Sequence, residues 1–321
     1  IRYIGDHSME FAGDVSMSSS GNTSRWQSDV AAGKKVEFSG DVDVSNTLNP
    51  STKYDIAVFG DGVMEFSGNV SGSGAIYRPR EDGQTGTLIF SGTASYQGAT
   101  TIHTGNLIVN GDASGLTGDM RIRSIEADAI PADNNQATLA GTGTIGAPTV
   151  TMHGKLNPGA ELSDSAGLLT FTGDMNMVID ITAAYGSGVP DDPIVNIELG
   201  GTTRGTDYDA FAVQGALTLN GNDPRDDDDL IFDEVPLSHL NVSLINSFSP
   251  SNGDSVDIMD WGTLSGEFKT ITLPTLGSGL SWDDSSLYTD GTLSVLGAAA
   301  LTGDFDDSGA VGQSDLSLVL G

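Results

Sequence analysis

The sequence predicts an all-β fold in which short strands coil into a β-solenoid, that is, a parallel β-helix. A phenylalanine motif recurs about every 27 residues, and the apolar runs between its copies are only three to five residues long and end at Gly, Ser or Asn. The apolar residues between the motifs show no helical spacing. A β-sandwich is the alternative all-β fold, although its strands have less reason to repeat at a fixed period.

The composition limits the partners and the location. The 321 residues include 44 acidic and 13 basic side chains, with a formal net charge of −31 and no cysteine. A surface with this much negative charge repels nucleic acids and anionic membranes, and we therefore expect no nucleic-acid partner. The same charge favours an extracellular or cell-surface location. No apolar run approaches the roughly 20 residues that a transmembrane segment needs, so the sequence predicts no transmembrane segment. Without cysteine there is no disulfide or thiolate chemistry.

The repeated motif sets the expected coil length in the N-terminal coils, residues 1–85, and continues beyond them. Its phenylalanines are separated by 27, 28, 24 and 81 residues, and 81 is three times 27. We therefore expect all five to occupy one equivalent position on the coils. At 20 to 28 residues per coil, roughly ten to fourteen coils would form a rod on the order of 50 to 65 Å long. The five phenylalanines are Phe11, Phe38, Phe66, Phe90 and Phe171.

Residues 86–111, GTLIFSGTASYQGATTIHTGNLIVNG, resemble the β-strand repeat of autotransporter passenger domains. Residues 139–161, with their Leu-x-Pro-Gly turn, and residues 197–221 are similar to further coils of such passengers. The resemblance implies a right-handed parallel β-helix over residues 86–222 and closing coils with a cap over 236–300. The matching positions in the first segment are Gly86, Leu88, Ser91, Gly92, Tyr96, Gly98, Thr100, Ile102, Gly105, Leu107 and Val109.

An acidic run at residues 223–235, DPRDDDDLIFDEV, interrupts the closing coils. Four consecutive aspartates cannot all face a core, so the run is predicted to be a protruding insertion loop. In an assembly it would meet a basic patch on a neighbour. The candidates for that patch are Arg78, Arg80, Arg121 and Arg123.

The last segment, residues 301–321, has the spacing of a calcium loop. An EF-hand loop places oxygen ligands at positions 1, 3, 5, 7, 9 and 12 and a glycine at position 6. Counting from Asp304, Gly309 takes position 6, and a water would serve at Gly312. We predict one Ca²⁺ site and a short helix after it, with a solvated acidic tail as the alternative. The ligands would be Asp304, Asp306, Ser308, the carbonyl of Ala310, Gly312 and Asp315.

This tail resembles half of a dockerin, a module that normally has two such loops and binds a cohesin. Passenger-like repeats joined to a dockerin-like tail are similar to secreted or surface proteins of planctomycete-like bacteria. With only one loop visible, the tail is expected either to dock to a partner or to cap the solenoid.

The search for an enzyme yields no catalytic or cofactor-binding residue. Parallel β-helices also include polysaccharide lyases and hydrolases, which need a base or a pair of carboxylates. The pairs Asp41 with Asp43 and Asp207 with Asp209 have a spacing that chance produces in so acidic a chain. The histidines show no metal-ligand spacing. They are His7, His103, His153 and His239.

The tryptophans offer two interpretations. Trp26, Trp261 and Trp282, with Tyr288, would form a sugar-stacking surface, or Trp261 and Trp282 would close the end of the solenoid, whose last coil otherwise exposes its core.

The sequence thus predicts a non-enzymatic extracellular structural protein, either a surface adhesin or a fibre subunit that assembles head to tail. Unpaired strand edges at the ends of a solenoid favour such a contact, which need not close. The alternatives are a protein that binds or cleaves polysaccharides and a module that docks to a partner.

Overall fold

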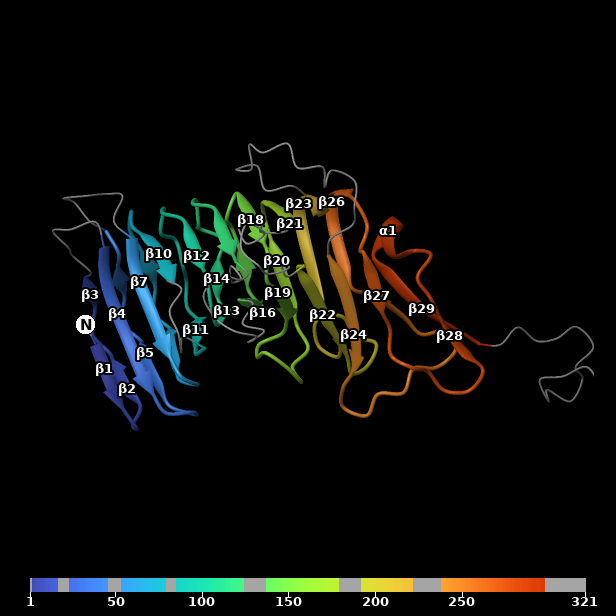
Figure 1. Cartoon of the computed structure of the whole chain (residues 1–321), viewed down its shortest axis with the longest axis horizontal. Helices are drawn as coiled ribbons and strands as arrows, with labels where there is room; N and C mark the ends of the chain where they lie inside the picture. The colour runs from blue at the N-terminus through green and yellow to red at the C-terminus, as the bar shows by residue number, and fades with distance from the viewer. Residues whose placement is uncertain are drawn as a thin grey trace, which may run out of the picture.

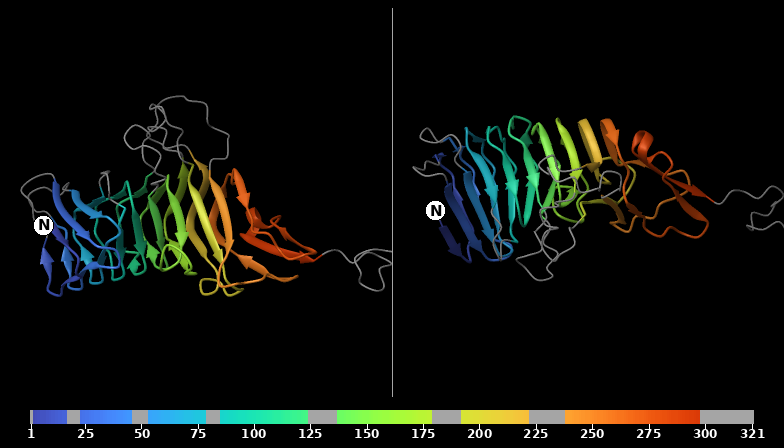
Figure 2. Two further views of the ribbon diagram at one scale, coloured as in Figure 1. Left: turned by 60° about the horizontal axis from the view of Figure 1, so that its bottom comes forward. Right: turned by 45° about the horizontal axis from the view of Figure 1, so that its top comes forward.

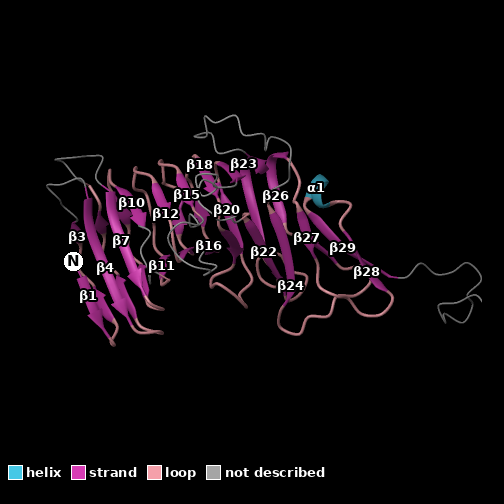
Figure 3. Ribbon diagram, viewed as in Figure 1, coloured by secondary structure: helices cyan, strands magenta, loops and turns pink. Residues whose placement is uncertain are grey.

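The computed structural model describes residues 2–16, 23–45, 53–78, 85–123, 137–178, 192–221 and 238–297. Within these ranges it is all-β except for the four-residue helix α1, Leu287–Asp290. Parallel strands follow one another along a single long axis from the N-terminal end to a small antiparallel sheet at the other end (Figures 1 and 3). The predicted parallel β-helix is confirmed, and its right-handed coil stays a prediction from the resemblance.

Each coil contributes strands to up to three faces, here called face 1, face 2 and face 3. Face 1 begins at the first coil and runs in parallel register to the last. Its strands are β1 (Arg2–Gly5), β4 (Thr23–Val30), β7 (Lys53–Phe59), β10 (Ala75–Arg78), β12 (Thr100–Ile102), β15 (Met120–Ile122), β18 (Thr149–Met152) and β21 (Asp174–Val178), followed by the C-terminal halves of β23 (Ala210–Gly221) and β26 (Met259–Ser265).

Face 2 is one continuous parallel sheet of ten strands, which agrees with the lower end of the predicted number of coils. The two side views show its strands stacked beside those of face 1 (Figure 2). The strands are β2 (Met9–Phe11), β5 (Lys35–Phe38), β8 (Val63–Phe66), β11 (Thr87–Phe90), β13 (Asn106–Val109), β16 (Thr138–Gly141), β19 (Lys155–Pro158), β22 (Ile194–Leu199), β24 (His239–Leu244) and β27 (Thr270–Thr272).

Face 3 has the shortest strands and joins face 1 at a corner. In β23, residues up to Val213 pair with β20 and residues from Leu217 pair with β21, and the register shifts between the two halves. One long strand therefore turns from face 3 into face 1. The strands are β3 (Val15–Ser16), β6 (Val42–Asp43), β9 (Val70–Ser71), β14 (Asp112–Ala113), β17 (Thr144–Ile145), β20 (Leu168–Phe171) and the N-terminal halves of β23 and β26.

The phenylalanine motif forms the inner row of face 2. Phe11, Phe38, Phe66 and Phe90 pair in register, and their rings stack with centroids 4.8, 5.0 and 5.5 Å apart. Offset stacking of this kind adds to the hydrophobic gain of burial. Because parallel strands repeat about every 4.8 Å, one phenylalanine per coil builds a continuous aromatic column.

The fifth phenylalanine was predicted wrongly. Phe171 lies on β20 of face 3, where it pairs with Ile145, and the phenylalanine row of face 2 continues with Val109 instead. Coil lengths explain the error. Equivalent positions on face 2 advance from Leu88 to Leu107, then to Leu139 and then to Leu156, so the coils vary in length and the multiple of 27 is accidental.

The Ser and Gly of the motif have separate roles. The hydroxyls of Ser39, Ser67 and Ser91 each donate to the glutamate of the preceding coil, at 2.5, 2.7 and 2.5 Å. Those acceptors are Glu10, Glu37 and Glu65, which are in register on the outer side of face 2. The glycine that follows lies against the backbone of the preceding coil. A Cβ at Gly68 would lie 2.2 Å from the carbonyl oxygen of Gly40, so the close stacking of coils requires glycine there.

The closing end has a different architecture. Three antiparallel strands, β25 (Ser255–Asp257), β29 (Thr292–Gly297) and β28 (Leu280–Asp283), pair in that order, and α1 packs near β26 and β29. Leu287 and Leu293 are fully buried in the same core cluster as the coils. Within the described residues the antiparallel sheet therefore caps the solenoid core, and the predicted bounds of 236–300 stay a prediction.

Candidate functional site

The predicted calcium ligands lie outside the described residues. These are Asp304, Asp306, Ser308, Ala310, Gly312 and Asp315, and the same holds for the acidic run at 223–235 and for Arg80. Within the seven described segments, no three His, Asp or Glu side chains gather closely enough to hold a metal ion. The calcium site stays a prediction. The surfaces of the described residues that can contact a partner are the two ends and the faces of the rod.

The N-terminal end of the described coils is an open sheet edge. Strands β1, β2 and β3 each pair on one side only, with β4, β5 and β6. Ile4 on β1 is 57% exposed, and Tyr3, Phe11 and Val15 are only partly buried against the core. An edge of this kind carries unpaired backbone N–H and C=O groups and pairs readily with another strand.

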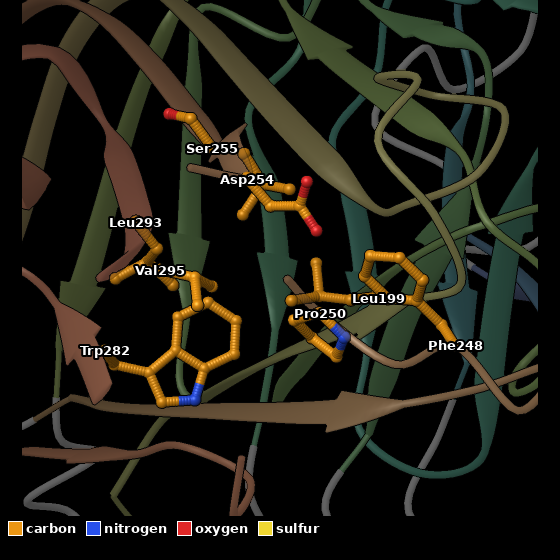
Figure 4. Close-up of a pocket in the computed structure, with 9 residues that line it drawn as sticks. Leu199, Phe248, Pro250, Asp254, Ser255, Trp282, Leu293 and Val295 are labelled. Atoms are coloured by element: carbon orange, nitrogen blue, oxygen red, sulfur yellow. The ribbon is translucent and has the colours of Figure 1, made fainter. Parts of the chain in front are cut away.

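The other end is closed by the cap, and a narrow apolar seam separates it from the last coils. Figure 4 shows Trp282 and Val295 of the cap on one side of the seam and Leu199 and Phe248 of the coils on the other. The side chains on the two sides leave no room for a water molecule between them. The indole N–H of Trp282 donates to the carbonyl of Pro274 at 2.9 Å, which fixes the ring in the seam. Trp282 also packs against the core cluster, and its role in closing the solenoid stays a prediction.

Polar contacts also join the cap to the coils. Arg204 Nη1 lies 3.0 Å from Asp257 on β25 of the cap and 2.6 Å from Asp260 on β26 of the coils. The hydroxyl of Tyr208, a buried residue of the preceding loop, accepts the backbone N–H of Asp257 at 3.1 Å. Burial is the main cause that raises the pKa of Asp257, and the neighbouring Arg204 opposes it. This cluster holds the cap in place.

Asp209 is the most perturbed carboxyl of the predicted pairs. It is 1% exposed, and its two oxygens accept the backbone N–H groups of Gly167 at 3.0 Å and Glu198 at 2.9 Å. Burial raises the pKa of Asp209 to about 8, with a further increase from the charge of Glu198, while the two N–H groups lower it. A carboxyl locked between two backbone donors serves as a structural joint between coils.

The other predicted side chains are likewise tied into the coil structure. Asp41 accepts the backbone N–H of Asn69 one coil further on, and Asp43 accepts that of Ser45. His239 contacts Asp192 and Thr270, and His153 is fully buried. Trp26 is 4% exposed and packs beside Phe38 in the core, so its assignment to a sugar-stacking surface is wrong.

Arg78 was also assigned wrongly. It is fully buried, and its guanidinium donates to the carbonyls of Val58, Gly86 and Asn106, which belong to three successive coils. Burial lowers the pKa of Arg78 to about 9. Because this arginine joins coils from within, it is not available to meet an acidic loop of a neighbour.

Sequence reasoning missed the two exposed apolar side chains at the ends. Among the described residues, Ile4 at 57% and Leu296 at 47% are the large hydrophobic residues that remain mainly exposed. Ile4 lies on the first strand and Leu296 on β29 of the cap, at opposite ends of the rod (Figure 1). Strand alternation in IRYIG indicates which residues face outward, but the sequence alone does not show how exposed their side chains are.

Comparison with known proteins supports the autotransporter resemblance over part of the chain. No family model matches. A segment of 101 residues, 31% of this chain, is 37% identical to a protein described as adhesin BmaC autotransporter, from Brucella suis biovar 1 (strain 1330). The segment corresponds to 2% of that adhesin's length. The dockerin-like tail stays a prediction.

Membrane-spanning helices are not found in the described part of the chain, where α1 is too short to cross a bilayer.

Proposed function

We propose that this chain is a non-enzymatic structural rod of the cell surface, with the role of an adhesin. The observation that carries the proposal is the continuous ten-stranded face of a parallel β-helix, whose hydrogen bonds join every coil from β2 to β27. The similarity to a segment of an adhesin autotransporter supports the same role and an extracellular location. Side chains of the kinds that catalyse reactions on other β-helices, such as Asp209 and His239, are committed here to structural hydrogen bonds.

The finer part of the proposal is that rods associate head to tail. The open edge of β1 to β3 offers unpaired backbone groups beside the exposed Ile4, and the cap offers the exposed Leu296 next to β28, which pairs on one side only. A contact between two different surfaces need not close, so it builds a filament. The net charge of −31 opposes association, and salt or calcium would weaken that repulsion.

The proposal includes one calcium ion in the tail, held by Asp304, Asp306, Ser308, the Ala310 carbonyl, Gly312 through a water, and Asp315. The tail follows the cap directly in the sequence, so a bound ion would stiffen the end that carries Leu296.

The test is electron microscopy and sedimentation of the protein in calcium and in chelator. We expect filaments in calcium that shorten in chelator. Ile4→Gln and Leu296→Gln should each abolish filaments, while Ile89→Gln, a half-buried outward position in the middle of face 2, should not.

A mixture of the Ile4→Gln and Leu296→Gln proteins sharpens the test. A head-to-tail contact leaves one intact interface per pair, so the mixture should form dimers and nothing longer. Dimers of Leu296→Gln alone would instead indicate a head-to-head contact through Ile4. Single rods of the wild type in both buffers would exclude the fibre and leave the single-rod adhesin. Release of fragments from an acidic polysaccharide would overturn the non-enzymatic role.

A further inference from the structure

Positive charge gathers on the outer side of face 1. From β4 to β15 the outward positions in register are Arg25, Asp55, Tyr77, Thr101 and Arg121. Each step between strands is about 4.8 Å, so the row from Arg25 to Arg121 is about 19 Å long. The row contains two arginines and one acid on a chain with 13 basic and 44 acidic side chains.

Three more side chains flank Tyr77 in this row. The ammonium of the exposed Lys53 lies 5.2 Å from the centre of the Tyr77 ring, and the ring of His103 meets Tyr77 edge to face at 5.3 Å. Burial and the charge of Asp55 raise the pKa of Tyr77, while the charge of Arg123 lowers it, so both charged groups lie near this hydroxyl. This group also encloses the acid Asp55, which pairs with Arg25 and Tyr77 in register. We call its other members the cationic row: Arg25, Lys53, Tyr77, His103, Arg121 and Arg123.

Face 2 has the opposite sign in its first three coils. Its outward row begins Glu10, Glu37 and Glu65, with Lys35 between two of these glutamates. The charge difference between the faces is clearest in the coil that has Arg25 on face 1 and Glu37 on face 2, and further along face 2 the outward row continues with the uncharged Ile89 and Ile108. An anionic partner is attracted to face 1 and repelled by face 2.

The backbone around the cationic row limits how a partner can bind. Strands β4, β7, β10 and β12 are hydrogen-bonded on both sides, so no edge is open for a peptide to add as a strand. Contact must come from side chains. Guanidinium groups match carboxylates, and the hydroxyls of Tyr77 and Thr101 match sugar hydroxyls. Beyond Arg121 the row continues with Thr151, which is buried, and then with the half-buried Asn176 and Thr218, which again suit hydroxyl groups.

We propose that the cationic row of face 1 binds a linear polysaccharide that carries carboxylates. The repeating spacing of the coils presents cationic and hydroxyl groups in a straight line, which fits a repeating polymer. This inference is independent of filament formation, because the row lies on the side of the rod and the association surfaces lie at its ends.

The experiment measures binding of polygalacturonate to the intact protein by calorimetry at low salt. Fully methyl-esterified polygalacturonate keeps the sugar backbone without the charge, and polyglutamate keeps the charge without the sugar. We expect binding of polygalacturonate only, with an affinity that falls when salt is raised. Lys53→Gln should weaken binding about fivefold, and Lys53→Gln with Arg121→Gln about tenfold or more.

Lys34→Gln is the matched control. Lys34 is exposed, like Lys53, and carries the same charge, but it lies in the turn beyond the other end of β4. It should leave the affinity unchanged. Three results would overturn the proposal: no binding at low salt, equal losses for Lys34→Gln and Lys53→Gln, or binding of polyglutamate as tight as that of polygalacturonate, which would assign the row to an acidic protein. Circular dichroism confirms that each variant is folded.

Discussion

The first four coils and the closing end are stabilised in different ways. In the first coils every contact recurs: phenylalanine stacks on phenylalanine, serine donates to the glutamate of the preceding coil, and glycine lies against glycine. At the closing end each contact occurs once, as with the Arg204 pair to Asp257 and Asp260 or the Trp282 bond to Pro274. Repetition leaves a pattern in the sequence, whereas single contacts do not.

The largest expected effect concerns the glycine stack of the repeated region. Gly68→Ala would place a Cβ 2.2 Å from the Gly40 carbonyl oxygen, and only separation of two coils can relieve a clash with backbone. We expect the loss of about 5 kcal/mol or more of unfolding free energy, or failure to fold, because ladder hydrogen bonds break together. Urea unfolding followed by circular dichroism measures it.

The control for this prediction is the same motif position in the first coil. A Cβ at Gly13 would meet nothing within 4 Å, so Gly13→Ala should change stability by less than about 0.5 kcal/mol. If Gly68→Ala is as mild as Gly13→Ala, the coils do not stack as closely as described. If Gly13→Ala is severe only at concentrations where rods associate, the open edge is occupied in the assembly.

The next effect belongs to the closing coils and depends on pH. The pKa of Asp209 is raised from 3.8 to about 8 by burial. Its contribution to stability is therefore fully present below the unfolded pKa near 4 and is lost as pH rises through about 8. Relative to Asp209→Asn, the wild-type protein should lose on the order of 4 kcal/mol between pH 4 and pH 8. Urea unfolding across this range measures the difference.

Asp207→Asn provides the comparison. Hydrogen bonds from Thr203 lower the pKa of Asp207, so its contribution is lost only as pH falls below the unfolded value. Between pH 5 and pH 8 its difference from the wild type should therefore be flat. A flat profile for Asp209→Asn as well would mean that the two backbone N–H groups keep Asp209 ionised throughout.

The contrast between repeated and single contacts explains which parts of the fold the sequence could predict. The spacing of Phe11, Phe38, Phe66 and Phe90 predicted a column that the structure confirms, because those coils have similar lengths. Phe171 was misplaced because coils beyond Phe90 differ in length, and a spacing rule cannot follow that. The burial of Arg78 depends on carbonyls from three coils, which no local pattern reports.

The candidate surfaces were harder to predict than the fold. The cationic row joins Lys53, Tyr77 and Arg121 from three coils, and only the register brings them to one face. Alternation within KYDIAVF and AIYR predicts which side chains face outward, but the coil-to-coil offset has to be known before the row appears. The calcium ligands follow from local spacing alone and remain a prediction.

The smallest expected effect concerns the hydrogen bonds from Ser39, Ser67 and Ser91 to the glutamates of the preceding coils, here called the serine ladder. Ser67→Ala removes a 2.7 Å hydrogen bond to Glu37, which also contacts Lys35, and should lower the unfolding free energy by about 1 kcal/mol. The cycle of Ser67→Ala with Glu37→Gln isolates the coupling between the two side chains. A coupling of zero would mean that the hydrogen bond from Ser67 to Glu37 does not stabilise the fold and that the serine acts only in the turn.

The first coil again provides the sharper comparison, because it has Ala12 where later coils have serine. Ala12→Ser adds a donor that has no glutamate of a preceding coil within the described chain, so in single rods it should change stability by less than about 0.5 kcal/mol. Measuring the stability of Ala12→Ser above the concentration at which rods associate tests whether the added hydroxyl contacts a neighbouring rod. If Ala12→Ser strengthens association there, an acceptor of the neighbouring rod lies across the open edge. If it has no effect, the end contact is made by Ile4 and the backbone edge, without continuation of the serine ladder.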